Sequence, residues 1–236
     1  GAFFKDLNYI KKSEDTVLSK IKNLKVALLR SLMPLNSSAK YRFKEFYNEP
    51  YEVYKLGELA NIVRGASPRP INDSKWFDDN SEIGWLRISD VTEQNGRIHY
   101  LSQRISKLGQ NKTRVLMTPH LLLSIAATIG KPVINKVPTG VHDGFLIFLN
   151  PNFDIDYMFQ WFEGYRSYWN RSGQPGTQVN LNSEIVKEQS ILLPKLEEQI
   201  RLAKLLNDVD NLIRLKENQI DNFSQLKKAL LQRMFV

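Results

Sequence analysis

Few side chains in this sequence have the types and spacing that catalysis requires. The histidines His99, His120 and His142 are widely spaced and match neither a zinc site nor a nucleophile–base–acid arrangement. His142 and Asp143 form the one neighbouring acid–base couple of interest. A role in a turn or in contacting nucleic acid is favoured for this couple over a catalytic one.

Three further segments resemble catalytic or cofactor motifs but lack specific residues. Segments 48–51 (Asn-Glu-Pro-Tyr) and 150–153 (Asn-Pro-Asn-Phe) each lack one proline of the Asn-Pro-Pro-aromatic signature with which amino-methyltransferases hold a flipped base. Segment 129–132 resembles the end of a phosphate-binding loop, but Ile125 replaces its first glycine and Pro132 its Ser or Thr. The sequence has no cysteine, which excludes thiolate metal sites. We therefore predict no catalytic residue, no cofactor and no metal.

Basic residues gather in two stretches that contain no acid, within a chain of formal net charge +8. The first lies between Glu93 and Asp143, and its basic residues are Arg97, Arg104, Lys107, Lys112, Arg114, Lys131 and Lys136. The second runs from residue 164 to residue 183 and carries Arg166 and Arg171. One such stretch could simply solvate a surface, but two in one domain favour a polyanionic partner, above all a nucleic acid.

The bulk composition is that of a globular protein. Of 236 residues, 42% are hydrophobic and 25% are charged, which favours one or two folded domains. No apolar run approaches the roughly 20 residues of a membrane span, and the N-terminus lacks the apolar core of a signal peptide. These features predict a cytoplasmic protein without membrane contact. The first residues, Gly1 and Ala2, hint at a tag remnant or a cut from a longer protein.

A globular region is expected after an N-terminal helix. Apolar residues at helical spacing predict a helix from Thr16 to Met33, capped by Ser13 or Asp15 and stopped by Pro34. Beyond it, turn signals separate β-type segments at residues 59–63, 85–88, 121–125 and 145–149. The aromatic segment 157–169 predicts a core helix rather than a base-stacking platform, and residues 172–178 predict a polar loop. This pattern favours an α+β domain on a curved mixed sheet.

Ten residues near the start of the chain recur near its end. Segments 24–33 and 226–235 are identical at five of ten positions with a constant offset of 202. The second copy closes a helix expected from about Glu197 to Met234, a rod of roughly 55 Å. Its near-heptad apolar stripe requires a partner helix, for which the first helix, shorter by about half, is the candidate. The predicted helix-pairing residues are Ile21, Leu24, Leu28, Leu206, Val209, Ile213, Ile220, Phe223 and Leu230.

Short motifs follow one another in a fixed order between the two repeated helices. They begin with segments 41–46 (Tyr-Arg-Phe-Lys-Glu-Phe), 55–59 (Lys-Leu-Gly-Glu-Leu) and 65–68 (Gly-Ala-Ser-Pro). They continue with segments 85–91, 122–124, 128–130, 176–178 and 193–199. Each motif is weak alone, but their order is specific and covers nearly the whole chain. Together they resemble a target-recognition domain in the specificity subunits of type I restriction-modification systems.

The resemblance implies one target-recognition domain between two conserved helices that pack antiparallel as a coiled-coil stalk. It divides the chain into an N-terminal helix and linker at residues 1–36, the target-recognition domain at 37–194 and the C-terminal helix at 195–236. Family members usually carry two such domains, so the chain resembles half of a subunit. The implied function is non-catalytic reading of one half of a bipartite double-stranded DNA target. The implied partners are methyltransferase subunits, a restriction subunit and a second copy of the chain, paired through the helices.

Polar and basic loop residues are the predicted DNA contacts. Lys and Arg neutralise phosphates, Arg favours guanine, and Asn or Gln favours adenine. The predicted contacts are Ser67, Arg69, Lys75, Arg87, Ser89, Asp90, Thr92, Ser124, Thr128, Lys131, His142, Asp143, Arg171, Ser172, Gln174, Thr177, Gln178 and Asn180. The sequence leaves open an alternative in which Asp90 caps a turn and pairs with Arg87.

Two other function classes stay open at this point. One is a coiled-coil assembly or adaptor protein whose head binds protein, against which the acid-free stretches argue. The other is a methyltransferase fragment, against which the incomplete motifs argue. The target sequence does not follow from the residues, because base preference depends on loop geometry and DNA shape.

Overall fold

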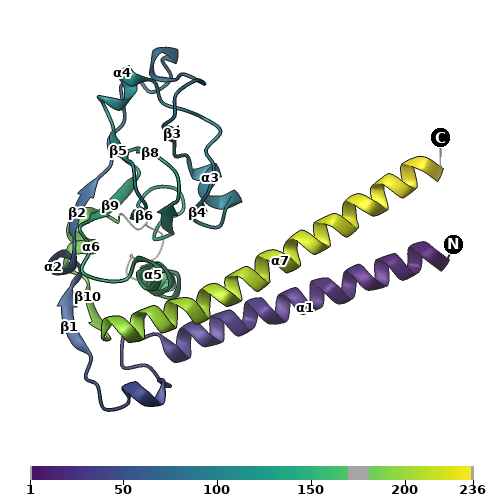
Figure 1. Cartoon of the computed structure of the whole chain (residues 1–236), viewed down its shortest axis with the longest axis horizontal. Coiled ribbons are helices and arrows are strands. Elements are labelled where there is room, and N and C mark those ends of the chain that lie inside the picture. The colour runs from purple at the N-terminus through teal and green to yellow at the C-terminus, as the bar shows by residue number, and fades with distance from the viewer. Residues whose placement is uncertain (1, 170–180, 235–236) are drawn as a thin grey trace, which may run out of the picture.

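The chain folds into a globular head and a two-helix stalk that projects from one end of the head (Figure 1). The structure is a computed structural model that describes residues 2–169 and 181–234. The stalk consists of α1 (Ala2–Leu32) and α7 (Leu196–Met234), and the head lies between them in the chain. The start of α1 and the end of α7 lie together at the far end of the stalk, here called the distal tip. The predicted α+β head on a helical stalk is confirmed.

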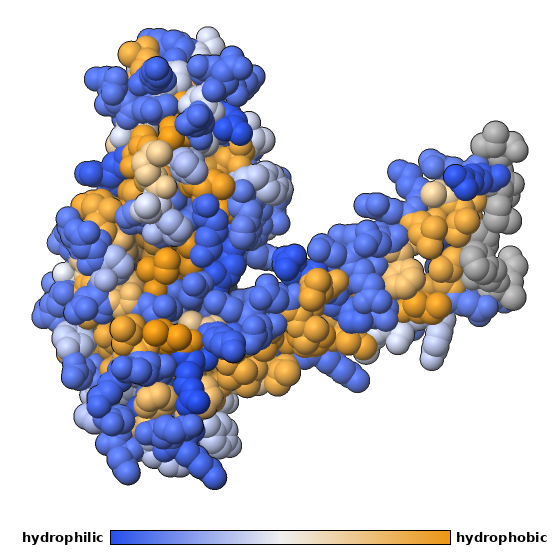
Figure 2. Space-filling model, viewed as in Figure 1, coloured by the Kyte–Doolittle hydropathy of each residue, from blue (hydrophilic) through white to orange (hydrophobic). Residues whose placement is uncertain are grey.

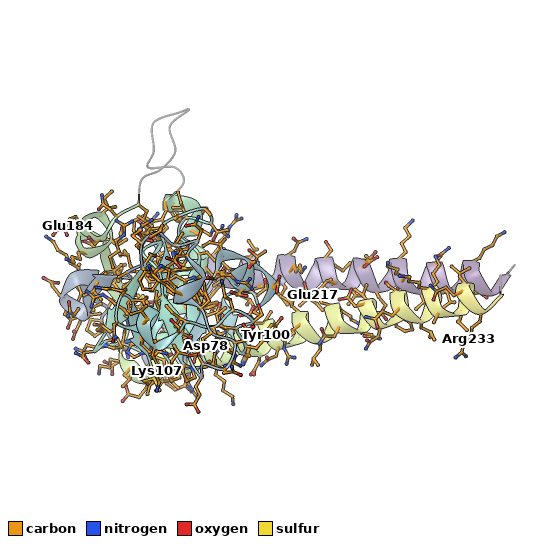
Figure 3. The ribbon with its side chains drawn as sticks, turned by 90° about the horizontal axis from the view of Figure 1, so that it is seen from above. Asp78, Tyr100, Lys107, Glu184, Glu217 and Arg233 are labelled. Atoms are coloured by element: carbon orange, nitrogen blue, oxygen red, sulfur yellow. The ribbon has the colours of Figure 1, made fainter. Side chains whose placement is uncertain are left out.

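α1 and α7 run antiparallel and lie side by side in two perpendicular views (Figures 1 and 3). They contain 31 and 39 residues, or about 46 and 58 Å. α1 is therefore longer than predicted, and Ser13 and Asp15 lie inside it instead of capping its start. The polar first half of α1 is helical because it lies along α7, where Glu14 pairs with Lys216.

Positions at alternating spacings of three and four residues form the seam between the two helices. The seam positions of α1, all at least partly shielded from solvent, are Leu7, Lys11, Glu14, Leu18, Ile21, Lys25, Leu28 and Leu32. Those of α7 are Leu202, Leu206, Val209, Ile213, Lys216, Ile220, Phe223, Lys227 and Leu230. The prediction that Leu24 belongs to this interface is not supported, because Leu24 is 52% exposed and lies on the flank of the seam. The other predicted pairing residues lie at seam positions.

The two seams are related by the same offset of 202 as the sequence repeat. Lys25 pairs with Asp210, and at the equivalent place Lys227 donates to Asn8 at 2.6 Å. Glu14 and Lys216 are themselves equivalent positions, so a local two-fold axis crosses the stalk at their ion pair. The repeated segment 24–33 consequently lies against the head, and residues 226–234 of its copy lie at the opposite end of the stalk, at the distal tip.

The head is built on a mixed sheet with the strand order β2-β9-β6-β7-β4. The bounds are β2 (Asn61–Arg64), β9 (Phe145–Leu149), β6 (Leu121–Ser124), β7 (Pro132–Asn135) and β4 (Arg97–Ile98). β4 pairs with β7 in parallel, and the other neighbours are antiparallel. The central strand β6 is buried on both faces: Leu121 and Leu123 join one core cluster and Leu122 joins another, as alternate strand residues must.

Helix α5 (Ile155–Trp169) packs into the first of these clusters, as the sequence predicted for a core helix. Trp161 and Phe162 are fully buried, and Trp161 stacks on Tyr165 with 4.4 Å between ring centroids. The same cluster contains Leu29 from the head end of α1 and Met33 directly after that helix. It also contains Leu202, Ala203 and Leu206 from α7. Head and stalk therefore share one hydrophobic core, which fixes the direction in which the stalk leaves the head.

Smaller elements complete the head. A second sheet has the order β3-β8-β5, with β3 (Gly84–Trp85), β8 (Thr139–Val141) and β5 (Arg114–Leu116), and β1 (Glu52–Lys55) pairs with β10 (Ser190–Leu193). The short helices are η1 (Lys44–Phe46), α2 (Leu56–Leu59), η2 (Ser74–Trp76), α3 (Ile88–Glu93), α4 (Lys107–Gln110) and α6 (Ser183–Glu188). The strands expected at 59–63 and 85–88 are shorter than predicted, because Leu59 ends α2 and Ile88 begins α3.

The linker between α1 and β1 is attached to the start of α7. Arg42 donates to both carboxylate oxygens of Glu198, which is only 1% exposed. The guanidinium also lies over the Tyr51 ring, 4.2 Å from its centroid, and donates to the backbone oxygen of Glu49. A buried charge held by a paired, hydrogen-bonded arginine anchors the linker where the stalk begins.

Substitution of Ile21 by alanine is expected to destabilise the stalk, because Ile21 lies in the seam. The loss should be roughly 2 kcal/mol, the lower end of the range for large-to-small changes at apolar contacts, because Ile21 is only partly buried. Leu24→Ala is the matched control, three residues away on the same helix but exposed, and should change stability by less than about 0.5 kcal/mol. Urea unfolding followed by circular dichroism measures both, and equal losses would contradict the seam.

Candidate nucleic-acid interface

Two loops of the head meet at Gly65, directly after β2. Ala66 N–H donates to Val141 O at 3.0 Å, which draws the loop after β2 onto the turn after β8. A Cβ atom at position 65 would lie 2.1 Å from the backbone oxygen of His142. No side chain tolerates that approach, so glycine at this position allows the loops to pack backbone against backbone.

The meeting loops enclose a cavity of about 310 Å³, here called the loop cavity. Its lining residues come from the loop after β2, the start of α3 and the turn after β8: Ser67, Arg69, Ile71, Trp85, Arg87, Ile88, His142 and Asp143. The structure thus brings together five predicted DNA contacts that are up to 76 residues apart in sequence: Ser67, Arg69, Arg87, His142 and Asp143.

Asp143 is the acceptor at the centre of this cluster. Its carboxylate accepts from Ser67 Oγ at 2.8 Å and from an Arg69 Nη at 2.6 Å, and its backbone oxygen accepts from Arg64 Nε at 2.6 Å. Burial by itself would raise the pKa of Asp143, but the Ser67 hydrogen bond and the charges of Arg69 and Arg64 together lower that pKa below its usual value. The carboxylate is therefore ionised at neutral pH and orients the arginines around it.

Arg87 is held rigidly by the buried carboxylate of Asp90, which is 1% exposed. Arg87 Nε and Nη2 donate to the two oxygens of Asp90 at 3.1 and 2.9 Å, and Nη2 also donates to Ser102 Oγ at 2.7 Å. Asp90 in addition accepts from the Arg87 backbone N–H at 2.9 Å, which caps the start of α3. The alternative in which Asp90 caps a turn and pairs with Arg87 is thus confirmed, and Asp90 does not face solvent.

His142 is neutral and has a single tautomer. Its ring packs against Phe145 at 4.8 Å and Trp85 at 5.9 Å between centroids. Nδ1 accepts from Gly144 N–H at 2.9 Å, and because an amide N–H can only donate, the ring proton lies on Nε2. Burial lowers the pKa of His142 more than Asp143, 3.9 Å away, raises it. The contact with Asp143 therefore involves a neutral imidazole ring and is not an ion pair.

Two further arginines lie beside the loop cavity and were not among the predicted contacts. Arg64 ends β2, and Arg114 begins β5; both are exposed. Arg114 Nε donates to the backbone oxygen of Arg64 at 2.7 Å, so the two residues are neighbours. Two features of the sequence indicate these arginines as candidate contacts: Arg64 directly precedes Gly65, and Arg114 lies within the first acid-free stretch.

Other predicted contacts lie on the surface near these loops. Lys75 pairs with Asp73 at 2.7 Å, and its ammonium lies 4.6 Å from the Trp76 ring centroid. Ser89 and Thr92 are exposed on α3, where Thr92 Oγ1 donates to Ile88 O at 3.2 Å. Their roles stay predictions.

The predicted contacts of the 124–131 turn are less accessible. Ser124 is fully buried and its hydroxyl donates to Ala126 O at 2.7 Å, so its prediction as a DNA contact is not supported. Thr128 Oγ1 is buried and has no hydrogen-bond partner within the described residues. Lys131 pairs with Glu163 of α5 at 2.6 Å and is 17% exposed.

Acidic residues of α5 neutralise part of the first acid-free stretch. Besides Lys131, Arg97 pairs with Asp156 of α5 and donates to Asn207 of α7 at 2.6 Å. The basic residues of that stretch that remain exposed are Lys107, Lys112, Arg114 and Lys136. The positive surface is therefore smaller than the sequence alone indicates. The predicted contacts Arg171, Ser172, Gln174, Thr177, Gln178 and Asn180 lie outside the described residues.

The two incomplete Asn-Pro motifs meet at a different place, the base of the head. Pro50, Pro151 and Asn152 line a cavity of about 330 Å³ there, together with Glu52 and Lys195. Within the described ranges, no three His, Cys, Asp or Glu side chains are grouped to hold a metal ion. In the same ranges, no helix has the length and apolar character needed to span a membrane.

Comparison with known proteins places residues 48–223 in a match to the family described as Type I restriction modification DNA specificity domain. Two similar curated proteins come from Methanocaldococcus jannaschii. The type I restriction enzyme MjaVIII specificity subunit is 25% identical over 82% of this chain and 44% of its own length. The putative type I restriction enzyme MjaX specificity subunit is 26% identical over 79% of this chain and 46% of its own length. The chain spans about half the length of these relatives.

Solved structures share the fold. A chain from work on complex assembly and conformational transition of the type I R-M system matches with a TM-score of 0.71 at 16% identity, over 98% of this chain and 56% of that one. The HsdS subunit from Thermoanaerobacter tengcongensis matches with a TM-score of 0.66 at 16% identity, over 99% and 55%. The type I S subunit from M. genitalium matches with a TM-score of 0.66 at 10% identity, over 100% and 59%.

Replacing Asp143 by asparagine is expected to reduce stability at neutral pH, by about 1 kcal/mol or less because the site is partly exposed. The pKa of Asp143 is lowered in the folded state, so its contribution is present above its unfolded pKa and is lost as pH falls through its folded pKa. The stability difference between parent and variant should therefore be constant near neutrality and shrink in acid. Urea unfolding at a series of pH values measures it, and a difference that grows in acid would contradict the assigned network.

Proposed function

The chain belongs to the type I restriction-modification DNA specificity family, and from that premise we propose that its head reads one half of a bipartite duplex DNA target without catalysis of its own. The observation that carries this proposal is the convergence of arginines and His142 around the loop cavity. These groups lie on loops that leave a rigid sheet, the arrangement that places side chains accurately on a ligand.

The charge at the loops suits DNA. Arg64 and Arg69 donate to Asp143, Arg87 donates to Asp90, and Arg114 donates to the backbone oxygen of Arg64. These four basic and two acidic side chains carry a formal net charge of +2. Guanidinium groups bind phosphates and guanine with paired hydrogen bonds, so the same cluster supports both affinity and base reading.

The local two-fold axis of the stalk supports a bipartite target. Segment 24–33 packs against this head through Leu29 and Met33. The axis relates that segment to residues 226–234 at the distal tip, where a second head could dock in the same way. Some 17 residues separate the axis at Glu14 from the head contact near Ser31, so two heads would stand about 50 Å apart. That spacing corresponds to roughly one and a half turns of duplex DNA, with a segment between the half-sites that neither head reads.

The stalk also carries a second apolar stripe that supports a scaffold role. On α1 its residues are seven positions apart, and on α7 they are seven or fourteen positions apart. The side chains are 36–52% exposed and are those of Ile10, Val17, Leu24, Leu205, Leu212 and Leu226. Apolar side chains are visible along the stalk in the space-filling view (Figure 2). The opposite flank of the seam carries ion pairs such as Lys22–Glu217 at 2.6 Å. In an antiparallel pair both apolar flanks face the same side, and we propose that methyltransferase subunits dock there.

Part of the stripe obeys the two-fold relation as well. Ile10 and Leu212 are equivalent positions, as are Leu24 and Leu226, whereas the position equivalent to Val17 is the polar Gln219. The two symmetric pairs fit two copies of one partner, bound to equivalent surfaces in opposite orientations. Methylation would then be carried out by the partners, and cleavage by a restriction subunit that joins them.

Alanine substitution of Arg64 and of Arg114 is expected to weaken DNA binding by the whole chain. Each change should reduce the slope of log affinity against log salt by about 1, because each arginine releases about one counterion from a phosphate. Gel-shift or fluorescence-anisotropy titrations over a range of salt concentrations measure this slope.

Arg201→Ala is the control, because Arg201 pairs with Glu45 at 3.0 Å beside the start of α7, at the base of the head. Its slope should equal that of the parent. If the parent chain shows no salt-dependent binding to duplex DNA, the head binds a different partner, and the adaptor-protein alternative replaces this proposal.

Aspartate substitution of both Leu24 and Leu212 is expected to leave the stalk paired but to reduce capture of methyltransferase subunits expressed with the chain. A charge within the stripe opposes burial against an apolar partner surface. Ser19→Asp with Asn218→Asp adds the same charge at exposed positions outside the stripe and should leave capture unchanged. Co-purification measures capture, and light scattering of the chain alone reveals self-association. Unchanged capture with a reduced mass would assign the stripe to a second copy of the chain instead.

A further inference from the structure

The loop cavity offers hydrogen-bond donors, while its acceptors are engaged within the protein. Asp143 accepts from Ser67 and Arg69 through its two carboxylate oxygens. Ser67 Oγ in turn accepts from the backbone N–H of Asp143 at 3.3 Å. The strongest acceptor of the cavity therefore already serves its own loops.

Two of the donors that remain are held in fixed positions. Arg87 uses Nε and Nη2 for Asp90 and Ser102, and in the part of the chain that the structure describes Nη1 has no acceptor. The guanidinium cannot rotate without breaking its paired bonds to a buried carboxylate. The Arg87 side chain is nevertheless 40% exposed and lines the loop cavity.

The second fixed donor is Nε2–H of His142. The Gly144 N–H holds Nδ1 as an acceptor, and the rings of Trp85 and Phe145 hold the imidazole plane. Among the described residues, no group accepts from Nε2. The side chain is 20% exposed and lines the same cavity as Arg87.

From this geometry we propose that the loop cavity recognises a DNA group that presents only hydrogen-bond acceptors, with Arg87 and His142 as the specificity-determining donors and Asp90 as the positioning residue. The inference rests on the proposed DNA-reading function and assigns the chemistry of one contact within it. Guanine and the backbone phosphate are the groups of this kind that offer an acceptor to each of the two donors: the guanine major-groove edge has O6 and N7, and the phosphate has its oxygens. The thymine major-groove edge has one acceptor, O4, beside a methyl group, and so serves only one of the two donors. The major-groove edges of adenine and cytosine each present an amino donor. That donor would face the donors of Arg87 and His142 and would have no acceptor, which is unfavourable.

The test selects duplexes from a random library with the whole chain and repeats the selection with Arg87→Lys and with His142→Phe. Lysine keeps the charge next to Asp90 but loses the planar fork, and phenylalanine keeps the ring but loses the donor. Arg201→Lys is the matched control for Arg87→Lys, since it also changes an arginine of an ion pair but far from the loop cavity. Thermal unfolding shows whether each variant folds. If His142→Phe does not fold, the comparison of the parent with Arg87→Lys is sufficient for the test.

If the group is guanine, both variants lose preference for guanine at the same position of the selected site, and their affinity for that site falls on the order of tenfold. Replacing that guanine by 7-deazaguanine, which lacks N7, then weakens the parent but not the variant that has lost the donor to N7. If the group is a phosphate, the selected sequence stays the same and affinity falls equally for all duplexes. Either result supports the assignment and identifies the acceptor.

Variants that keep both the affinity and the selected sequence of the parent would overturn the assignment while leaving the DNA-reading function intact. A parent chain that binds no duplex would instead overturn the DNA-reading function, and this inference with it.

Discussion

The antiparallel seam between α1 and α7 constrains everything else in the molecule, because both ends of the head enter the stalk through it. At the head end, Leu29 of α1, Met33 directly after that helix, and Leu202 and Leu206 of α7 are part of the head's own core. Buried apolar side chains contribute roughly 1.5–3 kcal/mol each, so the head cannot turn on the stalk without losing several such contacts. The direction of the stalk and the placement of the loop cavity are therefore set by one packed cluster, and the proposed partner surface lies on the same rigid rod.

The loops depend on carboxylates that orient arginines rather than on exposed positive charge alone. Asp90 is almost fully buried, a costly position that the paired bonds from Arg87 and the capping of α3 offset. Asp143 serves the loop after β2 in the same way through Ser67 and Arg69. A guanidinium that is already fixed by a carboxylate loses little conformational entropy when it binds a ligand, so less of the binding free energy is offset by ordering the side chain.

The sequence indicates those features that depend on local pattern. Strand β9 matches the apolar run at 145–149 without error, and the repeat indicates paired helices. The polar seam residue Glu14 interrupts the apolar periodicity, so the first half of α1 is recognisable as helix only through its contacts with α7. Tertiary neighbours also decide the surface charge: Lys131 looks free in sequence but pairs with Glu163 of α5. For the same reason Arg114, at the cavity edge, was not distinguished from the other basic residues of its stretch.

The ion pair between Glu14 and Lys216 has a consequence for which helices can associate. The pair lies on the two-fold axis, where each helix meets the equivalent position of its partner. Two α1 helices associated in the same register would place one Glu14 against another, and two α7 helices would oppose their Lys216 side chains. Like charges at a partly buried position are repulsive, so only the mixed pair is satisfied. The ion pair at the centre of the stalk thus favours pairing of α1 with α7 over pairing of two α1 or two α7 helices, although the two helices are related in sequence.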